Sequence, residues 1–146
     1  MPPALRRPAV PISHTKAVSE AVRHQSTREH HRRERAEDYV ELIGDLVHQL
    51  GEARLTEIAD RLGVSHVTAS KTLKRLEREG WVTCPAYRPI VLTQAGEQLA
   101  ASSKERHRIV LNFLLRLGVS PEQAEIDAEG IEHHVSQETL NAFQNS

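Results

Sequence analysis

Residues 55–80 read LTEIADRLGVSHVTASKTLKRLEREG, and this stretch decides the fold. Apolar residues at helical spacing predict a short helix over 55–62 and a second helix over 66–79. Gly63 supplies the positive φ that a tight turn between two helices needs, and Ser65 is a favourable N-cap for the second helix. The stretch therefore predicts a helix-turn-helix whose second helix exposes polar and basic side chains.

Two short β-prone runs follow the second helix. Residues 81–84 and 90–92 are typical of extended segments, and the Pro-rich run over 85–89 is typical of a turn. Together they predict a two-stranded hairpin, the wing, with Arg88 at its tip. Few helix pairs also carry a wing, so the combination favours DNA binding. The alternative is a winged helix that serves only for protein contacts.

Helical segments flank this block on both sides. Before it, residues 36–47 repeat apolar side chains at helical spacing and predict a first amphipathic helix that ends near Gly51. After it, Thr93 can cap one helix through Ala100, and an apolar stripe over 109–117 predicts another. Ser120-Pro121 and Ser136 mark the starts of two more.

The predicted fold class is mainly α: an N-terminal winged helix-turn-helix with a small β-hairpin wing, followed by an α-helical domain. We expect a flexible basic arm over 1–26, the DNA-binding domain over 27–93 and the helical domain over 94–146. Residues 1–37 carry a net charge of +4 and residues 94–146 a net charge of −4. This polarity favours DNA at one end and cations at the other.

The chain has the features expected of a cytoplasmic protein. Its single cysteine, Cys84, excludes an intrachain disulfide and fits a reducing interior. The opening residues lack the apolar core of a secretory signal. The longest apolar stretch, 109–119, is interrupted by Asn112 and Arg116 and is too short to cross a bilayer. We therefore expect no membrane partner.

Residues 129–134 read EGIEHH and carry the strongest metal signal. On a helix, Glu129, Glu132 and His133 project from one face, because residues three and four apart are neighbours. Two carboxylates and an imidazole without a thiol favour Mn²⁺ or Fe²⁺. Asp38 and Glu41 form a second carboxylate pair on the first helix. Either set could instead be a solvated acidic face.

Several other histidines are less informative by themselves. His107 stands alone before the apolar stripe and is typical of a surface or packing residue. We interpret His30-His31 as an exposed pair. His134 points about 100° round a helix from His133, so we leave it outside the ligand set.

Taken together, these motifs resemble a known family. Asp38 to Glu41, the helix-turn-helix, Arg106-His107 and the run DAEGIEHH over 127–134 are similar to the manganese transport regulators, the two-domain branch of the diphtheria toxin repressor family. The resemblance covers roughly residues 36–143. It implies a homodimeric, metal-activated repressor of manganese uptake genes with a binuclear Mn²⁺ site, in which the α-helical domain over 94–146 is the metal-binding and dimerisation domain.

The resemblance also implies the ligands of that site, with Glu41 and Glu132 as bridges. The implied set is Asp38, Glu41, His107, Glu129, Glu132 and His133. Its four carboxylates would balance two Mn²⁺ ions per subunit. Iron-responsive relatives place Met and Cys at the positions of Asp38 and Glu129, which favours manganese, although Fe²⁺ stays open.

By the same resemblance, the recognition helix begins at His66. The expected DNA-binding residues are Ser65, His66, Thr68, Ser70, Lys71, Lys74 and Arg88. We expect the lysines to contact phosphates, the polar side chains to reach base edges, and Arg88 to enter a minor groove. The family's helix proline and wing glycine are replaced here by Val67 and Pro89, so the operator sequence stays open.

These residues suggest that metal binding clamps the DNA-reading unit to the dimerisation unit. The expected partners are double-stranded operator DNA and a second copy of the chain, without a small organic substrate. A metal-dependent hydrolase would need an open coordination position and a further general acid or base, and none is indicated, so we expect no enzyme. A winged-helix regulator that senses Fe²⁺ or an organic ligand is the other alternative.

Overall fold

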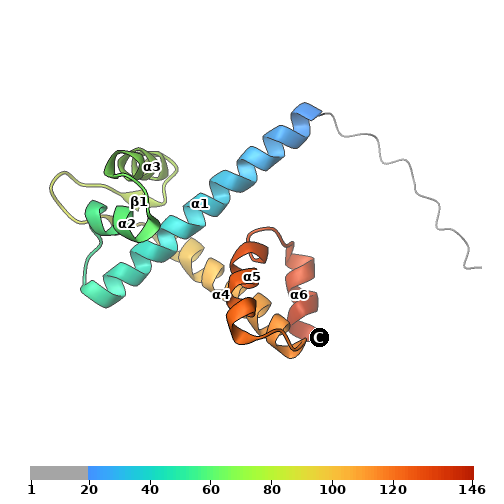
Figure 1. Ribbon diagram of the computed structural model, residues 1–146. Coiled ribbons are helices and arrows are strands. Elements are labelled where there is room, and N and C mark those ends of the chain that lie inside the picture. The colour runs from blue at the N-terminus through green and yellow to red at the C-terminus, as the bar shows by residue number, and fades with distance from the viewer. Residues whose placement is uncertain (1–19) are drawn as a thin grey trace, which may run out of the picture.

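The computed structural model describes residues 20–146, so most of the predicted arm lies outside the described residues. These residues form six helices and one hairpin: α1 (Glu20–Leu50), α2 (Leu55–Leu62), α3 (His66–Arg78), β1 (Val82–Thr83), β2 (Val91–Leu92), α4 (Gln94–Arg116), α5 (Pro121–Ile131) and α6 (Gln137–Asn145). Figure 1 shows α2, α3 and the hairpin beside the C-terminal half of α1, with α4 leading away to α5 and α6. No helix in the described range is long and apolar enough to span a membrane.

The helix-turn-helix forms as predicted. Gly63 has a φ of 66° and ends α2, and its backbone N–H donates to Asp60 O. The Ser65 side chain accepts a hydrogen bond from the Thr68 N–H at the start of α3. The apolar faces of both helices are buried, including Ile58, Ala59, Ala69, Leu73 and Leu76.

The wing is shorter than the sequence predicts. Its strands have two residues each and pair antiparallel, with Val82 opposite Leu92. Thr93 fastens the start of α4 to the turn between α3 and β1, because its hydroxyl donates to Gly80 O at 2.6 Å and accepts from the Gly96 N–H at 3.1 Å. The start of α4 is therefore fixed against the DNA-binding half.

Two helices differ from prediction. α1 begins at Glu20 rather than near residue 36, so residues 20–26 of the predicted flexible arm are helical. The stretch lacks glycine and proline, and pairs such as Arg33 with Glu37, 3.2 Å apart, support it along one face. α4 is a single helix where two were predicted, because its interior also lacks a helix breaker after Gly96.

Two apolar cores hold these elements together. The larger core joins α1, the helix-turn-helix, the wing and the start of α4 around Val40, Ile43, Ile58 and Leu76. The smaller core joins the end of α4 to α5 and α6 around Val110, Ala128 and Leu140, beside the stacked rings of Phe113 and Phe143. α4 belongs to both cores and so links the two halves.

Candidate metal centre

Acidic and imidazole side chains from three segments meet where α1, α4 and α5 pack together. Asp38 and Glu41 lie on α1, His107 on α4 and Glu129 in the last turn of α5. Glu132 and His133 come just after that helix. The sequence predicts them within a helix, but α5 ends at Ile131, and the His134 N–H then donates to Ile131 O in a tighter turn.

These donors form two triads that share one carboxylate. Asp38, Glu129 and His133 make the first triad, and His107, Glu129 and Glu132 make the second. Within each triad the donor atoms lie within 4.8 Å of one another. Because Glu129 belongs to both, the two candidate positions for a cation are adjacent.

Glu132 lies between the two imidazoles. One of its carboxylate oxygens is 2.5 Å from His107 Nδ1, and the other is 3.3 Å from His133 Nε2. Its side chain is only 2% exposed. A buried carboxylate with one oxygen toward each imidazole has the arrangement of a bridging ligand.

Asp38 and Glu41 complete the set from the side of α1. Asp38 Oδ1 is 3.5 Å from His133 Nε2. Glu41 stands outside both triads, but it lines the same hollow of about 400 Å³ as Asp38, His107 and Glu129. All six residues implied by the resemblance thus converge, with Glu41 at the margin.

Glu37 is a candidate site residue that was not among those predicted from the sequence. Its Oε2 is 2.6 Å from His133 Nδ1, and both side chains are almost fully buried. The signal was present in the sequence, because Glu37 is a charged residue on the apolar face of α1 between Ala36 and Val40. A carboxylate on Nδ1 fixes the imidazole so that Nε2 faces Asp38 and Glu132.

Two more residues contact the site. Arg106 was part of a motif in the sequence but was given no role there, and Glu125 was not singled out. Arg106 donates two hydrogen bonds to Glu132 O and one to Val135 O, all between 2.7 and 2.9 Å, which holds the turn after α5 against α4. Glu125 Oε2 is 2.9 Å from His107 Nε2, so it orients that ring through the nitrogen away from Glu132.

The proximity of these groups changes their acidity. The hydrogen bond to Glu37 raises the pKa of His133 to about 9. Burial raises the pKa of Glu132 to about 7, although His107 opposes this change. Burial likewise raises the pKa of Asp38 to about 6, against the effect of His133. Without a cation, the centre therefore holds protons near neutral pH.

The remaining groups respond to the same surroundings. Burial by itself would lower the pKa of His107, but Glu125 and Glu132 raise it. Burial would raise the pKa of Glu37, but the hydrogen bond with His133 lowers it. Burial raises the pKa of Glu41, and the nearby Glu129 adds to this increase. Only a cation, or bound protons, can offset the repulsion among so many carboxylates.

The donor chemistry fits a divalent metal ion. The six converging side chains offer carboxylate oxygens and imidazole nitrogens, and no thiol is among them. Such a set suits a hard or borderline ion such as Mn²⁺ or Fe²⁺. Glu37, Glu125 and Arg106 supply the outer contacts that metal-binding histidines and turns commonly need.

The DNA-binding residues expected from the sequence lie on or beside α3. All are exposed except Ser70, which is half-buried. Ser65 and Thr68 also hydrogen-bond to each other at the cap of the helix. Ser70, Lys74 and Arg88 line a groove of about 410 Å³ between α3 and the wing. His66 and Lys71 are exposed on the same helix.

Tyr87 was missed at the tip of the wing. Its side chain is fully exposed, and its φ of 59° is unusual for an aromatic residue. It lines the same groove as Lys74 and Arg88. An exposed aromatic residue with an unfavourable backbone torsion, next to an arginine, is typical of a residue that contacts a partner.

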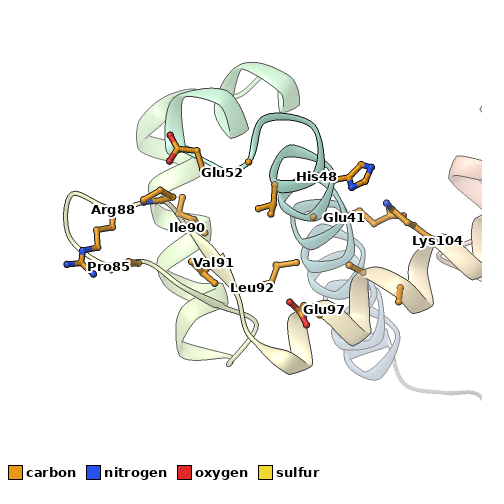
Figure 2. A pocket seen from close by; sticks show the side chains of 16 residues that line it. Glu41, His48, Glu52, Pro85, Arg88, Ile90, Val91, Leu92, Glu97 and Lys104 are labelled. Atoms are coloured by element: carbon orange, nitrogen blue, oxygen red, sulfur yellow. The ribbon is translucent and has the colours of Figure 1, made fainter.

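A larger groove of about 780 Å³ runs between α1, the wing and α4 (Figure 2). Ile90, Val91 and Leu92 give it an apolar wall, and Lys104 closes one side through its 2.5 Å ion pair with Asp45. Glu41 lies at its edge. Neither metal-binding triad lines this groove, but Glu41 lines both the groove and the hollow at the metal centre, so the two cavities share that residue.

Comparison with known protein families agrees with this geometry. Residues 32–90 match the N-terminal DNA-binding domain of the iron-dependent repressors, and residues 93–146 match their metal-binding and dimerisation domain. The transcriptional regulator MntR of Salmonella typhimurium is 59% identical over 119 residues, which are 82% of this chain and 76% of that protein. The MntR regulator of Listeria monocytogenes is 36% identical over 105 residues, 72% of this chain and 74% of that protein.

Solved structures give the same result. The structure of the manganese regulator SloR matches 75% of this chain with 30% identity and a TM-score of 0.64. The structure of a manganese-dependent transcriptional repressor in complex with manganese matches 75% of this chain with 28% identity and a TM-score of 0.67. The chain spans about half the length of these two proteins. The predicted resemblance and fold class are confirmed, and the chain belongs to the iron-dependent repressor family of transcriptional regulators.

Proposed function

We propose that this protein is a Mn²⁺-responsive repressor of manganese uptake genes that binds operator DNA as a homodimer. The observation that carries the proposal is the convergence of Asp38, His107, Glu129, Glu132 and His133 from elements of both halves. Relatives named as manganese regulators, in sequence and in structure, support the choice of metal.

We further propose that the six residues Asp38, Glu41, His107, Glu129, Glu132 and His133 hold two cations. The two triads support two positions, and Glu132 is the favoured bridge. Glu41 is the second bridge expected from the resemblance, and its place at the margin of the hollow is compatible with that role. When bound, the cations supply positive charge that offsets the four carboxylates.

The residues of this chain then set the geometry of the DNA-reading units. Asp38 and Glu41 stand on α1, which also packs against the helix-turn-helix, whereas the other ligands stand on α4, in the last turn of α5 and just after it. Repulsion among the carboxylates loosens the packing of α1 against α4 and α5. Offsetting that repulsion tightens the packing. In a dimer, the two recognition helices must match half-sites about 34 Å apart, or a multiple of that distance.

On DNA, we propose that Lys71 and Lys74 contact phosphates and that His66 and Ser70 reach base edges. Arg88 would enter a minor groove from the wing. Ser65 and Thr68 belong to the same set, although their hydroxyls already bond to each other. The groove between α3 and the wing supports this assignment.

Operator binding in the presence of Mn²⁺ or chelator tests the proposal. We expect Mn²⁺ to increase operator affinity by at least tenfold, because a full switch from about 1% to about 99% of the DNA-binding conformation would raise it by roughly 100-fold. The Glu132→Gln variant should lose this response. Equal affinity with chelator and with Mn²⁺ would refute metal activation, and the same assay at buffered free Fe²⁺ and Zn²⁺ would identify the preferred ion.

A further inference from the structure

A second group of metal-binding side chains lies where α1 faces the turn after α5. His30 and Glu34 are four residues apart on α1 and so share one face of the helix. His134 approaches that face from the turn. Its Nε2 is 3.6 Å from Glu34 Oε2, and its ring centroid is 6.2 Å from that of His30.

These separations are close to those between ligands of one ion. With metal–ligand bonds of about 2.0–2.1 Å, donor atoms of a tetrahedral site lie about 3.3 Å apart, and the centroids of two imidazoles about 5–6 Å apart. Glu34 and His134 already fall near the first value. A small rotation of the exposed His30 side chain would bring its ring to the second value.

We propose that His30, Glu34 and His134 form an accessory site for a divalent transition-metal ion. Two imidazoles and one carboxylate make this set richer in nitrogen than the metal centre, so it favours Zn²⁺ or Co²⁺ over Mn²⁺. The half-exposed His134 leaves the other coordination positions open to water. The site does not depend on the function proposed above.

An ion at this site would join two parts of the protein. Every residue of α1 from Glu20 to Arg33 is exposed, so this basic stretch stands out from the rest of the structure (Figure 1). His134 directly follows His133 in the turn that α4 holds through Arg106. The accessory site would therefore brace the exposed stretch of α1 against the turn of the metal centre.

The number of Co²⁺ ions bound per subunit tests the proposal. Equilibrium dialysis of the full chain with Co²⁺, followed by elemental analysis, should show one ion fewer per subunit for His30→Gln and Glu34→Gln than for the unmodified chain. The visible absorption of four-coordinate Co²⁺ should fall in parallel. Both variants lie outside the metal centre, and circular dichroism would verify their helicity.

His31→Gln is the matched control, because His31 is also an exposed histidine but points about 100° away from His30 on α1. It should bind as much Co²⁺ as the unmodified chain. An unchanged ion count in His30→Gln and Glu34→Gln, or an equal loss in His31→Gln, would overturn the accessory site. Mn²⁺-dependent operator binding is a separate measurement, so either proposal can fail alone.

Discussion

At the scale of single residues, the metal centre depends on side chains that hold its ligands as much as on the ligands. Glu132 is buried with one oxygen toward each imidazole. Glu37 holds His133 through Nδ1, and Glu125 holds His107 through Nε2. These contacts fix which ring nitrogen can face a cation, and a metal-binding imidazole loses affinity when that contact is removed.

Replacement of Glu37 tests this role. We expect Glu37→Gln to weaken Mn²⁺ binding by about 10- to 100-fold. Without the buried carboxylate charge, the proton is no longer fixed on Nδ1 of His133. Isothermal titration calorimetry measures the affinity. Glu29→Gln, on the exposed part of the same helix, is the control. Equal Mn²⁺ affinities in the two variants would show that Glu37 has no such role.

At the scale of secondary-structure elements, α4 connects the DNA-binding half to the metal centre. Thr93 fastens the first turn of α4 to Gly80, just before the wing, and His107 lies further along the same unbroken helix. Gly96 permits this close approach, because a Cβ at that position would lie only 2.1 Å from Trp81 O. The contact is with backbone, which cannot move aside as a side chain can.

Replacement of Gly96 tests this approach. We expect Gly96→Ala to destabilise the protein by roughly 1–3 kcal/mol through overpacking. Gly130→Ala is the control, because a Cβ there would have no neighbour within 4 Å. Alanine in that helix should be neutral or stabilising by up to about 1 kcal/mol. Urea unfolding of the metal-free proteins measures both, and equal stability of the two variants would contradict the close packing.

At the scale of the whole molecule, protons compete with metal for the junction between the two halves. His133, with a pKa of about 9, is protonated at neutral pH and must release a proton before Nε2 can bind a cation. Glu132, with a pKa of about 7, is partly protonated under the same conditions. Metal affinity should therefore rise with pH across the neutral range.

Proton release gives a direct measurement of this competition. We expect Mn²⁺ binding at neutral pH to release about one proton or more per subunit. Calorimetry in buffers of different ionisation enthalpy should then give different apparent binding enthalpies. A binding enthalpy independent of the buffer would contradict the raised pKa values of His133 and Glu132.

The stability of the metal-free protein should change in the opposite direction. The stabilisation by His133 is fully present below its ordinary pKa of 6.5 and is lost as the pH rises through about 9. The raised pKa of Glu132 lowers the stability in the same direction, as the pH rises from 4.5 to about 7. We therefore expect the metal-free protein to unfold at lower urea concentration at pH 9 than at pH 6, and the reverse order would contradict this interpretation.

The sequence by itself determined the local structure. The turn at Gly63 and the helix caps at Ser65, Thr93 and Ser120 were predicted correctly, because such signals act within a few residues of the chain. The two carboxylate pairs were also visible, but their assignment to one site came from the family resemblance. The length of α1 and the continuity of α4 were missed, since charged helical segments carry a weak apolar pattern.

Only the tertiary structure decided which of these groups meet. Glu37 and His133 are 96 residues apart in the chain, and their contact depends on how α1 packs against the turn after α5. The turn that ends α5 before Glu132 depends on packing as well, because Arg106 on α4 donates hydrogen bonds to the carbonyl oxygens of Glu132 and Val135. A local pattern could mark Glu37 as a charged residue on an apolar helix face, but charge pairing between distant segments is a property of the packed chain, so no local pattern could specify its partner.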